Sequence, residues 1–272
     1  MSLKPAQPQS IGGVLDTTFQ LYKASVVKMI PLTLLSLLAA SPVYIYYIYV
    51  FIKVGGSANP AAAMASFGPG LGYWLSMGLT FVLSQLMLAA SAIRMNEIGA
   101  GSDAGIGTAL RTALPRLPSL AIAALLYTIA FAVGFLLLII PGVIFSVSLL
   151  LFVGTCVFDN KGPVGSLTAS HRLVWGNWWR TSAILVVGFI LLLVLYMVMI
   201  LLISIVSPLA ATAVGPGNVL VFTLIIGVVV GALMGLVMTP FYIALMLALY
   251  WDLKLRKEGA DLAGRVGALN PA

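Results

Sequence analysis

The sequence predicts an all-α membrane protein, a polytopic bundle of six transmembrane helices with three amphipathic interfacial helices at one membrane face. Of its 272 residues 61% are hydrophobic and only 8% are charged, whereas a soluble domain carries about 25% charged residues. The apolar residues fall into six segments, each near the length of about 20 residues that a helix needs to cross a bilayer. We therefore expect residues 1–272 to form a single integral membrane domain.

The six segments follow one another with different interruptions. The first contains Pro42, the second holds Gln85, and the third and fourth are separated only by Pro141-Gly142, which predicts a hairpin turn. The sixth is the longest and contains Pro240, which predicts a kink, a tilt or emergence into the aqueous phase. The predicted spans are 29–52, 71–93, 120–140, 143–158, 182–206 and 219–250.

The charged residues lie at one set of span ends. Every Lys and Arg except Lys53, and every Asp and Glu, falls before the first span, between spans two and three, between spans four and five, or after the sixth. Because Lys and Arg accumulate in cytoplasmic loops, this pattern predicts a bacterial inner-membrane protein with both termini in the cytoplasm. The net charge of +7 fits attraction to anionic lipids. No basic run stands free of the spans, so nucleic acid is not expected as a partner, and the mixed-charge stretch 252–261 is expected to be solvated.

Each charged connector begins an amphipathic segment that leads into the next span. The segments from Ile11 and from Ile106 share the pattern Ile-Gly-x-x-Leu, and a third begins at Pro163. The chain is therefore predicted to contain three pseudo-repeats of interfacial helix, span, short outer turn and span, at 10–98, 103–158 and 163–256, with a cytoplasmic tail at 257–272. The predicted apolar face of the third segment is Val164, Leu167, His171 and Val174.

The amphipathic helices have two interpretations. They either act as elbows that help the spans insert, or form a cytoplasmic collar that grips lipid head groups or a partner protein. The second interpretation selects four arginines as candidate head-group contacts, because the cationic side chains of such helices face lipid phosphate. These residues are Arg111, Arg116, Arg172 and Arg180.

Two further features within the spans are candidates for packing or for a pathway. Gln85 is the most polar residue inside a span, and it either forms an interhelical hydrogen bond or lines a cavity. Gly227, Gly231 and Gly235 recur every four residues and so form a smooth face on one helix. Such a face predicts close helix packing, within the chain or between two copies in a homodimer.

The sequence holds no set of residues typical of an enzyme or of ion-coupled transport. No ionisable side chain lies at mid-depth in a predicted span, where ion and proton coupling place them. The single histidine, His171, and the single cysteine, Cys156, do not make a metal site, and motifs for nucleotide binding or serine hydrolysis are absent. We expect a non-enzymatic protein with no metal and no cofactor. Trp175, Trp178 and Trp179 are predicted to anchor the fifth span at the interface.

Three stretches of the chain carry a family resemblance. They are IPGV at 140–143, DNKGP at 159–163 leading to LVWGNWWR at 173–180, and LYWDLKLRKEG at 249–259. These stretches resemble the membrane-domain family named after glycerophosphoryl diester phosphodiesterase, which includes many stand-alone bacterial integral membrane proteins. The family often carries an acidic residue soon after the Gly-Pro pair, whereas Gly165 and Ser166 follow Val164 here. The sequence contains no phosphodiesterase barrel, so the resemblance implies location and fold, and no hydrolase activity.

The leading functional expectation is a non-enzymatic inner-membrane protein that binds membrane lipid or a partner membrane protein in envelope maintenance. Its expected partners are the phospholipid bilayer, anionic lipids in particular, and a partner membrane protein or a second copy of the chain. The alternative is a transporter, exporter or channel for a lipid-like or amphipathic molecule, which needs no charge at mid-depth. A membrane enzyme is the third and least favoured class.

Overall fold

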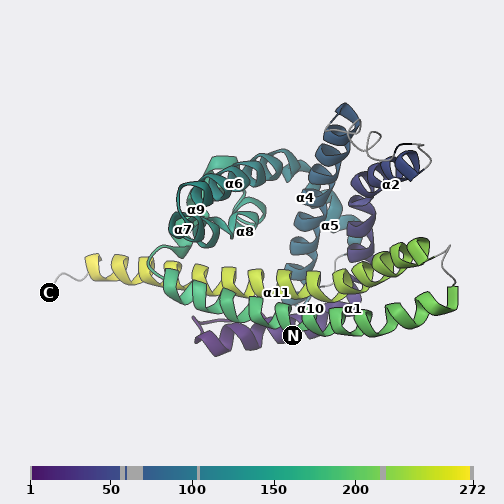
Figure 1. The fold of residues 1–272 in the computed structure, drawn as a ribbon. Coiled ribbons are helices and arrows are strands. Elements are labelled where there is room, and N and C mark those ends of the chain that lie inside the picture. The colour runs from purple at the N-terminus through teal and green to yellow at the C-terminus, as the bar shows by residue number, and fades with distance from the viewer. Residues whose placement is uncertain (1, 56–58, 60–69, 103–104, 215–218, 270–272) are drawn as a thin grey trace.

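The computed structural model describes residues 2–55, 59, 70–102, 105–214 and 219–269, and within these ranges it contains helices and no strand (Figure 1). A short 3-10 turn, Leu114–Arg116, joins α5 to α6. The helices are α1 Ile11–Ala39, α2 Ser41–Gly55, α4 Leu71–Gly99, α5 Ile106–Ala113, α6 Leu117–Leu137, α7 Ile139–Leu149, α8 Phe152–Val157, α9 Pro163–Val174, α10 Trp178–Val214 and α11 Val219–Leu269.

Six helical segments of the described chain are long and apolar enough to cross a membrane. The predicted all-α polytopic bundle is therefore confirmed, and the chain is a multi-pass membrane protein. The six segments are Ile11–Ala39, Leu71–Gly99, Ile106–Leu137, Ile139–Val157, Trp178–Ile205 and Val229–Gly259.

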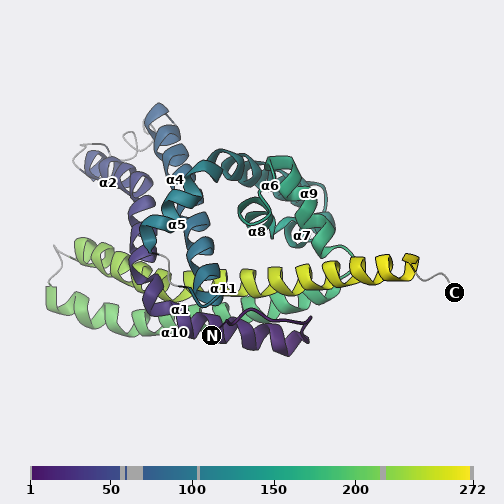
Figure 2. The same ribbon diagram turned by 180° about the vertical axis from the view of Figure 1, so that it is seen from behind.

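The helices divide into two packed groups. α10 and α11 lie side by side, and α1 packs against both α11 and α4 (Figures 1 and 2). On the other flank α6, α7, α8 and α9 form a second cluster. Small residues let the first group approach closely, since Ala89 and Ala90 of α4 and Ala244 and Ala248 of α11 are fully buried.

The first predicted span, 29–52, was wrong in its boundaries. The amphipathic segment from Ile11 forms one continuous helix, α1, as far as Ala39. The helix is interrupted at Ala40, and α2 begins at Ser41. Pro42 lies in the first turn of α2, where its missing N–H is not needed and its fixed φ suits a helix start. The break frees the N–H of Val43, which donates to Thr80 Oγ1 of α4 at 3.2 Å.

The hairpin between the third and fourth spans turns at a different residue from the one predicted. Leu138 has an extended backbone with φ −167° and ψ 152°, and α7 starts directly after it. Pro141 therefore lies in the first turn of α7 rather than in the hairpin turn. Gly142 packs beneath Phe135 of α6, because a Cβ at this position would lie only 2.4 Å from Phe135 Cδ2. The Pro-Gly pair starts a helix and permits a close helix contact.

The fourth span is also broken, and α9 fills the break. α9 runs antiparallel to α8 and α7, since Ser166 O accepts from Thr155 Oγ1 at 2.7 Å while Ser170, one turn later, meets the end of α7. Ser170 Oγ accepts the N–H of Leu151 at 3.1 Å and donates to Ser148 O at 2.9 Å. The side chain of Ser170 thus replaces backbone hydrogen bonds that the break between α7 and α8 removes.

The buried face of α9 differs from the predicted one. Ser166, Ser170 and Val174 are fully buried, whereas Val164 of the predicted apolar face is 67% exposed. The prediction holds for Val174 and for Leu167, which packs against the core. The hydrophobic pattern missed Ser166 and Ser170 because it selects apolar residues only. Their small hydroxyl groups allow close approach and bond to backbone atoms.

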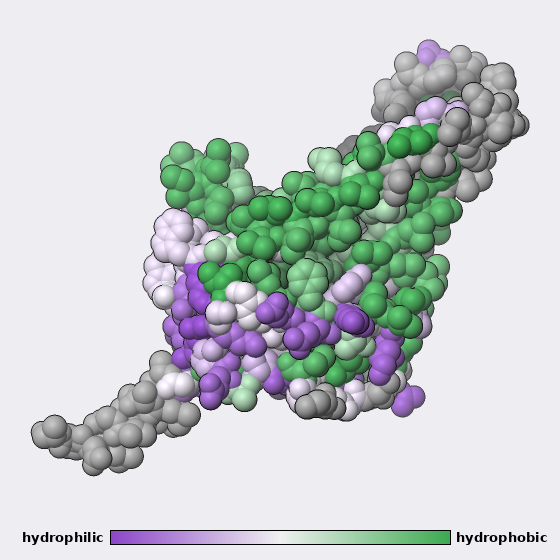
Figure 3. Space-filling view, turned by 90° about the horizontal axis from the view of Figure 1, so that it is seen from below, coloured by the Kyte–Doolittle hydropathy of each residue, from purple (hydrophilic) through white to green (hydrophobic). Residues whose placement is uncertain are grey.

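On the face drawn in Figure 3, polar residues gather at one end. Figure 3 shows hydrophilic residues gathered at one end of the visible face, with hydrophobic residues covering most of the coloured surface beyond them. A broad apolar surface of this kind is expected where side chains face lipid tails instead of water.

Candidate functional site

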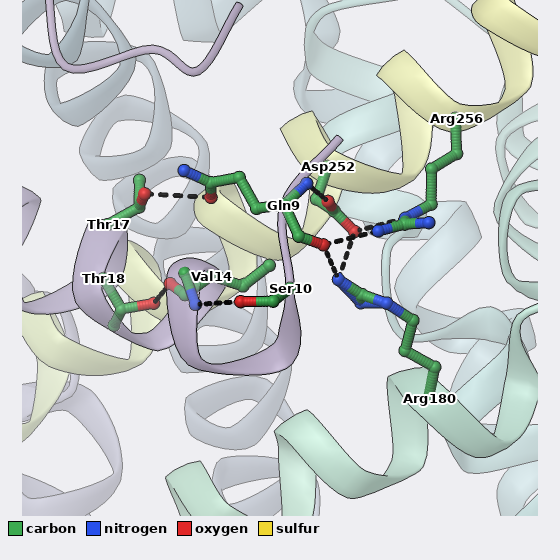
Figure 4. A network of polar contacts seen from close by, with 9 residues as sticks. Gln9, Ser10, Val14, Thr17, Thr18, Arg180, Asp252 and Arg256 are labelled. Carbon is green, nitrogen blue, oxygen red and sulfur yellow. Dashed lines mark hydrogen bonds and ion pairs between the residues drawn. The ribbon is translucent and has the colours of Figure 1, made fainter. Parts of the chain in front are cut away.

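A cluster of four residues, here called the clasp, ties the start of the chain to α10 and α11. Asp252 of α11 is fully buried, accepts the N–H of Gln9 at 2.7 Å and Arg256 Nε at 3.0 Å, and forms an ion pair with Arg180 Nη2 at 3.2 Å (Figure 4). Both guanidinium groups also donate to the backbone oxygen of Gln9. One buried carboxylate therefore joins three segments that are far apart in the sequence.

The segment before α1 makes further contacts on the same end of the protein. The N–H of Leu3 donates to Gly99 O at the end of α4 at 2.7 Å, and Lys4 Nζ lies 5.4 Å from the centre of the Trp251 ring. Burial lowers the pKa of Lys4, and the nearby ammonium group of Lys254 lowers this pKa further. The N-terminal segment thus connects the end of α4 to the end of α11.

The last turns of α11 also hold the two connectors that flank α9. Lys254 Nζ pairs with Asp159 at 2.5 Å, and Lys257 Nζ donates to the backbone oxygen of Trp175 at 3.0 Å. Together with the clasp, these contacts join the start of α1, the end of α4, the α8–α9 and α9–α10 connectors, and the end of α11. The structure therefore brings together the ends that the charge pattern assigns to one membrane face.

An apolar groove of about 740 Å³ lies beside the clasp, between the start of α7 and the α9–α10 connector. Its volume falls within the range of roughly 300–1,000 Å³ that is typical of small-molecule sites. We call it the α7–α10 groove. One wall consists of Ile139, Ile140, Val143 and Ile144, and the other of residues 175–180.

The antiparallel course of α9 explains where this groove forms. Because α9 runs back along α8 and α7, its end carries Trp175 to the level of the first turns of α7. The chain then reverses at Gly176, whose φ of +94° is readily adopted only by glycine. The N–H of Asn177 closes the turn on Val174 O at 2.9 Å. This turn presents Trp178 and Arg180 to the groove at the start of α10.

Two residues that line the groove carry buried donors without an acceptor among the described residues. They are the indole Nε1 of Trp178 and the Nη1 of Arg180. A buried donor that lacks an acceptor costs about 1–3 kcal/mol, so such groups normally bond to protein, water or a ligand. The guanidinium of Arg180 has Nη2 engaged in the clasp, while its Nη1 is buried from solvent without an acceptor among the described residues.

The four arginines selected from the sequence lie in different surroundings. Arg180 enters both the clasp and the groove lining. Arg111 is exposed in the last turn of α5, Arg116 is half-buried in the 3-10 turn, and Arg172 is exposed in the last turn of α9. The structure brings Arg180 together with Arg256, a residue that the sequence analysis did not select.

The other selected residues lie away from the groove. Gln85 is half-buried on α4, and its Oε1 is buried without a donor among the described residues. On the predicted glycine face, a Cβ at Gly235 would lie 3.4 Å from Leu37 Cδ2, while Gly231 has no atom within 4 Å. Gly227 lies outside the residues whose surroundings the structure describes.

Two tight glycine contacts with α11 occur at positions that the sequence analysis did not select. A Cβ at Gly188 of α10 would lie 2.3 Å from a methyl group of Leu245, and one at Gly99 would lie 2.6 Å from the Trp251 ring. These glycines let α10 and α4 approach α11. They are single glycines without a repeating spacing, which is why the four-residue pattern did not reveal them.

The predicted solvent exposure of Asp252 was wrong. Asp252 belongs to the stretch 252–261, which was expected to be solvated. Asp252 is fully buried. Two signals in the sequence point toward it: Arg256 follows four residues later on the same helix, and both residues lie within the stretch 249–259 that carries the family resemblance.

No group of three or more His, Cys, Asp or Glu in the described ranges could hold a metal ion. No family model and no solved structure matches the chain. The site is therefore interpreted from its own geometry.

Proposed function

We propose that this chain is a non-enzymatic protein of the bacterial inner membrane that binds a membrane phospholipid in the α7–α10 groove, and that it serves envelope maintenance. The observation that carries the proposal is the pairing of an exposed apolar wall with a polar end. Ile139 and Ile140 are each 71% exposed, and Trp178 and Arg180 face them across the groove. An acyl chain fits the first surface, and the excess positive charge of Arg180 and Arg256 over Asp252 attracts a lipid phosphate to the second.

The proposed membrane orientation rests on charge. Every Lys and Arg except Lys53 lies at the span ends that meet around the clasp or in the alternate connectors on the same predicted side. Such positively charged ends are cytoplasmic in bacterial inner membranes. The α9–α10 connector that bears Arg180 is one of these ends, whereas the start of α7 follows the predicted outer turn, so the groove joins two segments that the charge pattern assigns to opposite faces. Membership of the membrane-domain family described above is part of this proposal.

A second candidate is an exporter or channel for an amphipathic molecule. One observation favours it: the Oε1 of Gln85, a half-buried amide on α4, has no donor among the described residues, so a polar group from outside those residues would complete it. Loss of transport of a labelled phospholipid in Gln85→Leu, with lipid binding retained, would favour this candidate over a binding protein.

The proposed function is tested by native mass spectrometry of the protein released from nanodiscs of native lipid. Val143→Trp places a large ring in the groove, and Val186→Trp adds the same ring to an exposed apolar position of α10 outside the groove lining. We expect phospholipid adducts on the wild-type subunit and on Val186→Trp, and their loss in Val143→Trp. Equal adducts on all three proteins would refute binding in the groove.

A further inference from the structure

We infer that the α6–α7 hairpin is re-entrant: its tip, residues 136–140, lies among the acyl chains of the cytoplasmic leaflet instead of reaching the outer face. The segments Ile106–Leu137 and Ile139–Val157 are both long and apolar enough to span a membrane, so the inference concerns where their shared turn lies. It rests on the membrane orientation proposed above and is independent of whether a lipid occupies the α7–α10 groove.

α9 lies across the end of α11. Lys254 pairs with Asp159, just before α9. Lys257 donates to the backbone oxygen of Trp175, directly after α9. α9 has 12 residues and is about 18 Å long, whereas positions 254 and 257 are about 4.5 Å apart along α11. A helix held at both ends by one turn of α11 crosses it, and α9 slants across the direction of α11 in Figures 1 and 2.

α7 follows the course of α9 and brings the hairpin turn to the α9–α10 connector. The two helices are antiparallel, and Ile139 and Ile140 line the same groove as Trp175 and Arg180. Two walls of one groove cannot lie on opposite sides of a hydrocarbon core about 30 Å thick. Since the charge pattern assigns the connector to the cytoplasmic side, the hairpin turn lies on that side as well.

The composition of the tip fits lipid rather than water. No polar side chain occurs between Thr128 and Ser146, whereas the other two predicted outer connectors, 56–69 and 207–218, both contain serine and asparagine. Every residue of the tip is at least two-thirds exposed. In water this apolar surface would be unfavourable, while acyl chains cover it without such a cost.

The backbone of the turn also suits hydrocarbon, where polar backbone groups have to be satisfied by the protein. Leu138 alone separates α6 from α7. Its N–H donates to Gly134 O at 3.1 Å, and its oxygen accepts the N–H of Gly142 at 3.3 Å. Pro141 has no N–H, so the start of α7 has one donor fewer to satisfy.

Two tryptophans indicate the depth of the tip. Trp175 and Trp179 are exposed and line the groove opposite Ile139 and Ile140. Tryptophan rings prefer the level of the head groups. The tip beside them is therefore expected just beneath the cytoplasmic head groups.

The side of the membrane is tested with cysteine variants in a Cys156→Ser background, which has no other cysteine. We expect a short bismaleimide to bridge Ile140→Cys and Trp179→Cys in membranes, and not to bridge Asn59→Cys and Trp179→Cys. An impermeant maleimide should label Asn59→Cys in intact spheroplasts of a bacterial host, and Trp179→Cys only after lysis.

The surroundings of the tip are tested with a bimane fluorophore on Leu138→Cys in liposomes. We expect strong quenching by lipids that carry a nitroxide on the acyl chain, and weak quenching by iodide in water. The control is bimane on Lys161→Cys, an exposed position between α8 and α9, where iodide should quench strongly and the nitroxide lipids weakly.

The outcomes separate the inference from the proposals on which it rests. If Ile140→Cys and Trp179→Cys are not bridged, or if iodide quenches the tip as strongly as the control, the re-entrant hairpin is wrong, and lipid binding in the groove is still decided by the native mass spectrometry. Labelling of Trp179→Cys in intact spheroplasts would overturn the proposed orientation, and the inference with it.

Discussion

Asp252→Asn is predicted to destabilise the protein strongly through the clasp. The substitution keeps the shape of the side chain and removes its charge, so the two guanidinium groups of Arg180 and Arg256 lose their shared anion. Breaking a buried ion pair by removing one partner costs about 3–5 kcal/mol. Both arginines keep some solvent contact, with side chains 17% and 29% exposed, so we expect the lower end, about 3 kcal/mol.

The assay is reversible unfolding in mixed micelles, followed by circular dichroism as the fraction of denaturing detergent is raised. Asp16→Asn is the matched control, because Asp16 is an exposed carboxylate of α1 and its replacement should change the free energy of unfolding by less than about 0.5 kcal/mol. The double variant Asp252→Asn with Arg180→Gln should lose less than the sum of the single losses, since the two residues interact directly. A loss in Asp252→Asn no larger than that of the control would refute the reasoning.

Three further predictions use the same unfolding assay. Ser170→Ala should cost about 1–3 kcal/mol because the buried N–H of Leu151 loses its acceptor, and an unchanged free energy would contradict the proposed repair of the α7–α8 break. Gly188→Ala should lower the free energy of unfolding by about 1–3 kcal/mol through overpacking. Gly231 has open space around it, so Gly231→Ala should raise the free energy of unfolding by about 0.5–1 kcal/mol. Equal effects of the two substitutions would argue against close packing at Gly188. Because the pKa of Lys4 is lowered in the folded protein, its charged form opposes folding, so stability should rise as the pH rises through this lowered pKa toward the ordinary value of 10.5. Lys4→Met should remove that rise, and the same rise in both proteins would assign it to another group.

The sequence predicts the class of fold because its strongest signals are local. Six apolar segments and charges confined to alternate connectors are visible in any window of about 20 residues. The helix breaks are less visible, since they depend on partners far along the chain. The N–H of Val43 relies on Thr80, and that of Leu151 relies on Ser170. The hydrophobic pattern does not indicate which serine or threonine will accept these groups.

The candidate site was predicted only in part for the same reason. Arg180 and its neighbouring tryptophans stand out by composition, but their partners come from both ends of the chain, with Gln9 and Asp252 separated by 243 positions. A charge on an apparently solvated helix end is expected to stay in water unless an ion partner covers it. The buried state of Asp252 therefore follows from the tertiary contacts with Arg180 and Gln9, and not from its local sequence.

Direct imaging of the α7–α10 groove tests the central claim most directly. We would determine the structure of the protein in native-lipid nanodiscs by electron cryomicroscopy and examine the space between Ile140 and Arg180. The account predicts an elongated density along the start of α7 that ends in a head group against Arg180 and Trp178. A groove closed by the protein's own side chains, or filled by a second protein, would contradict it.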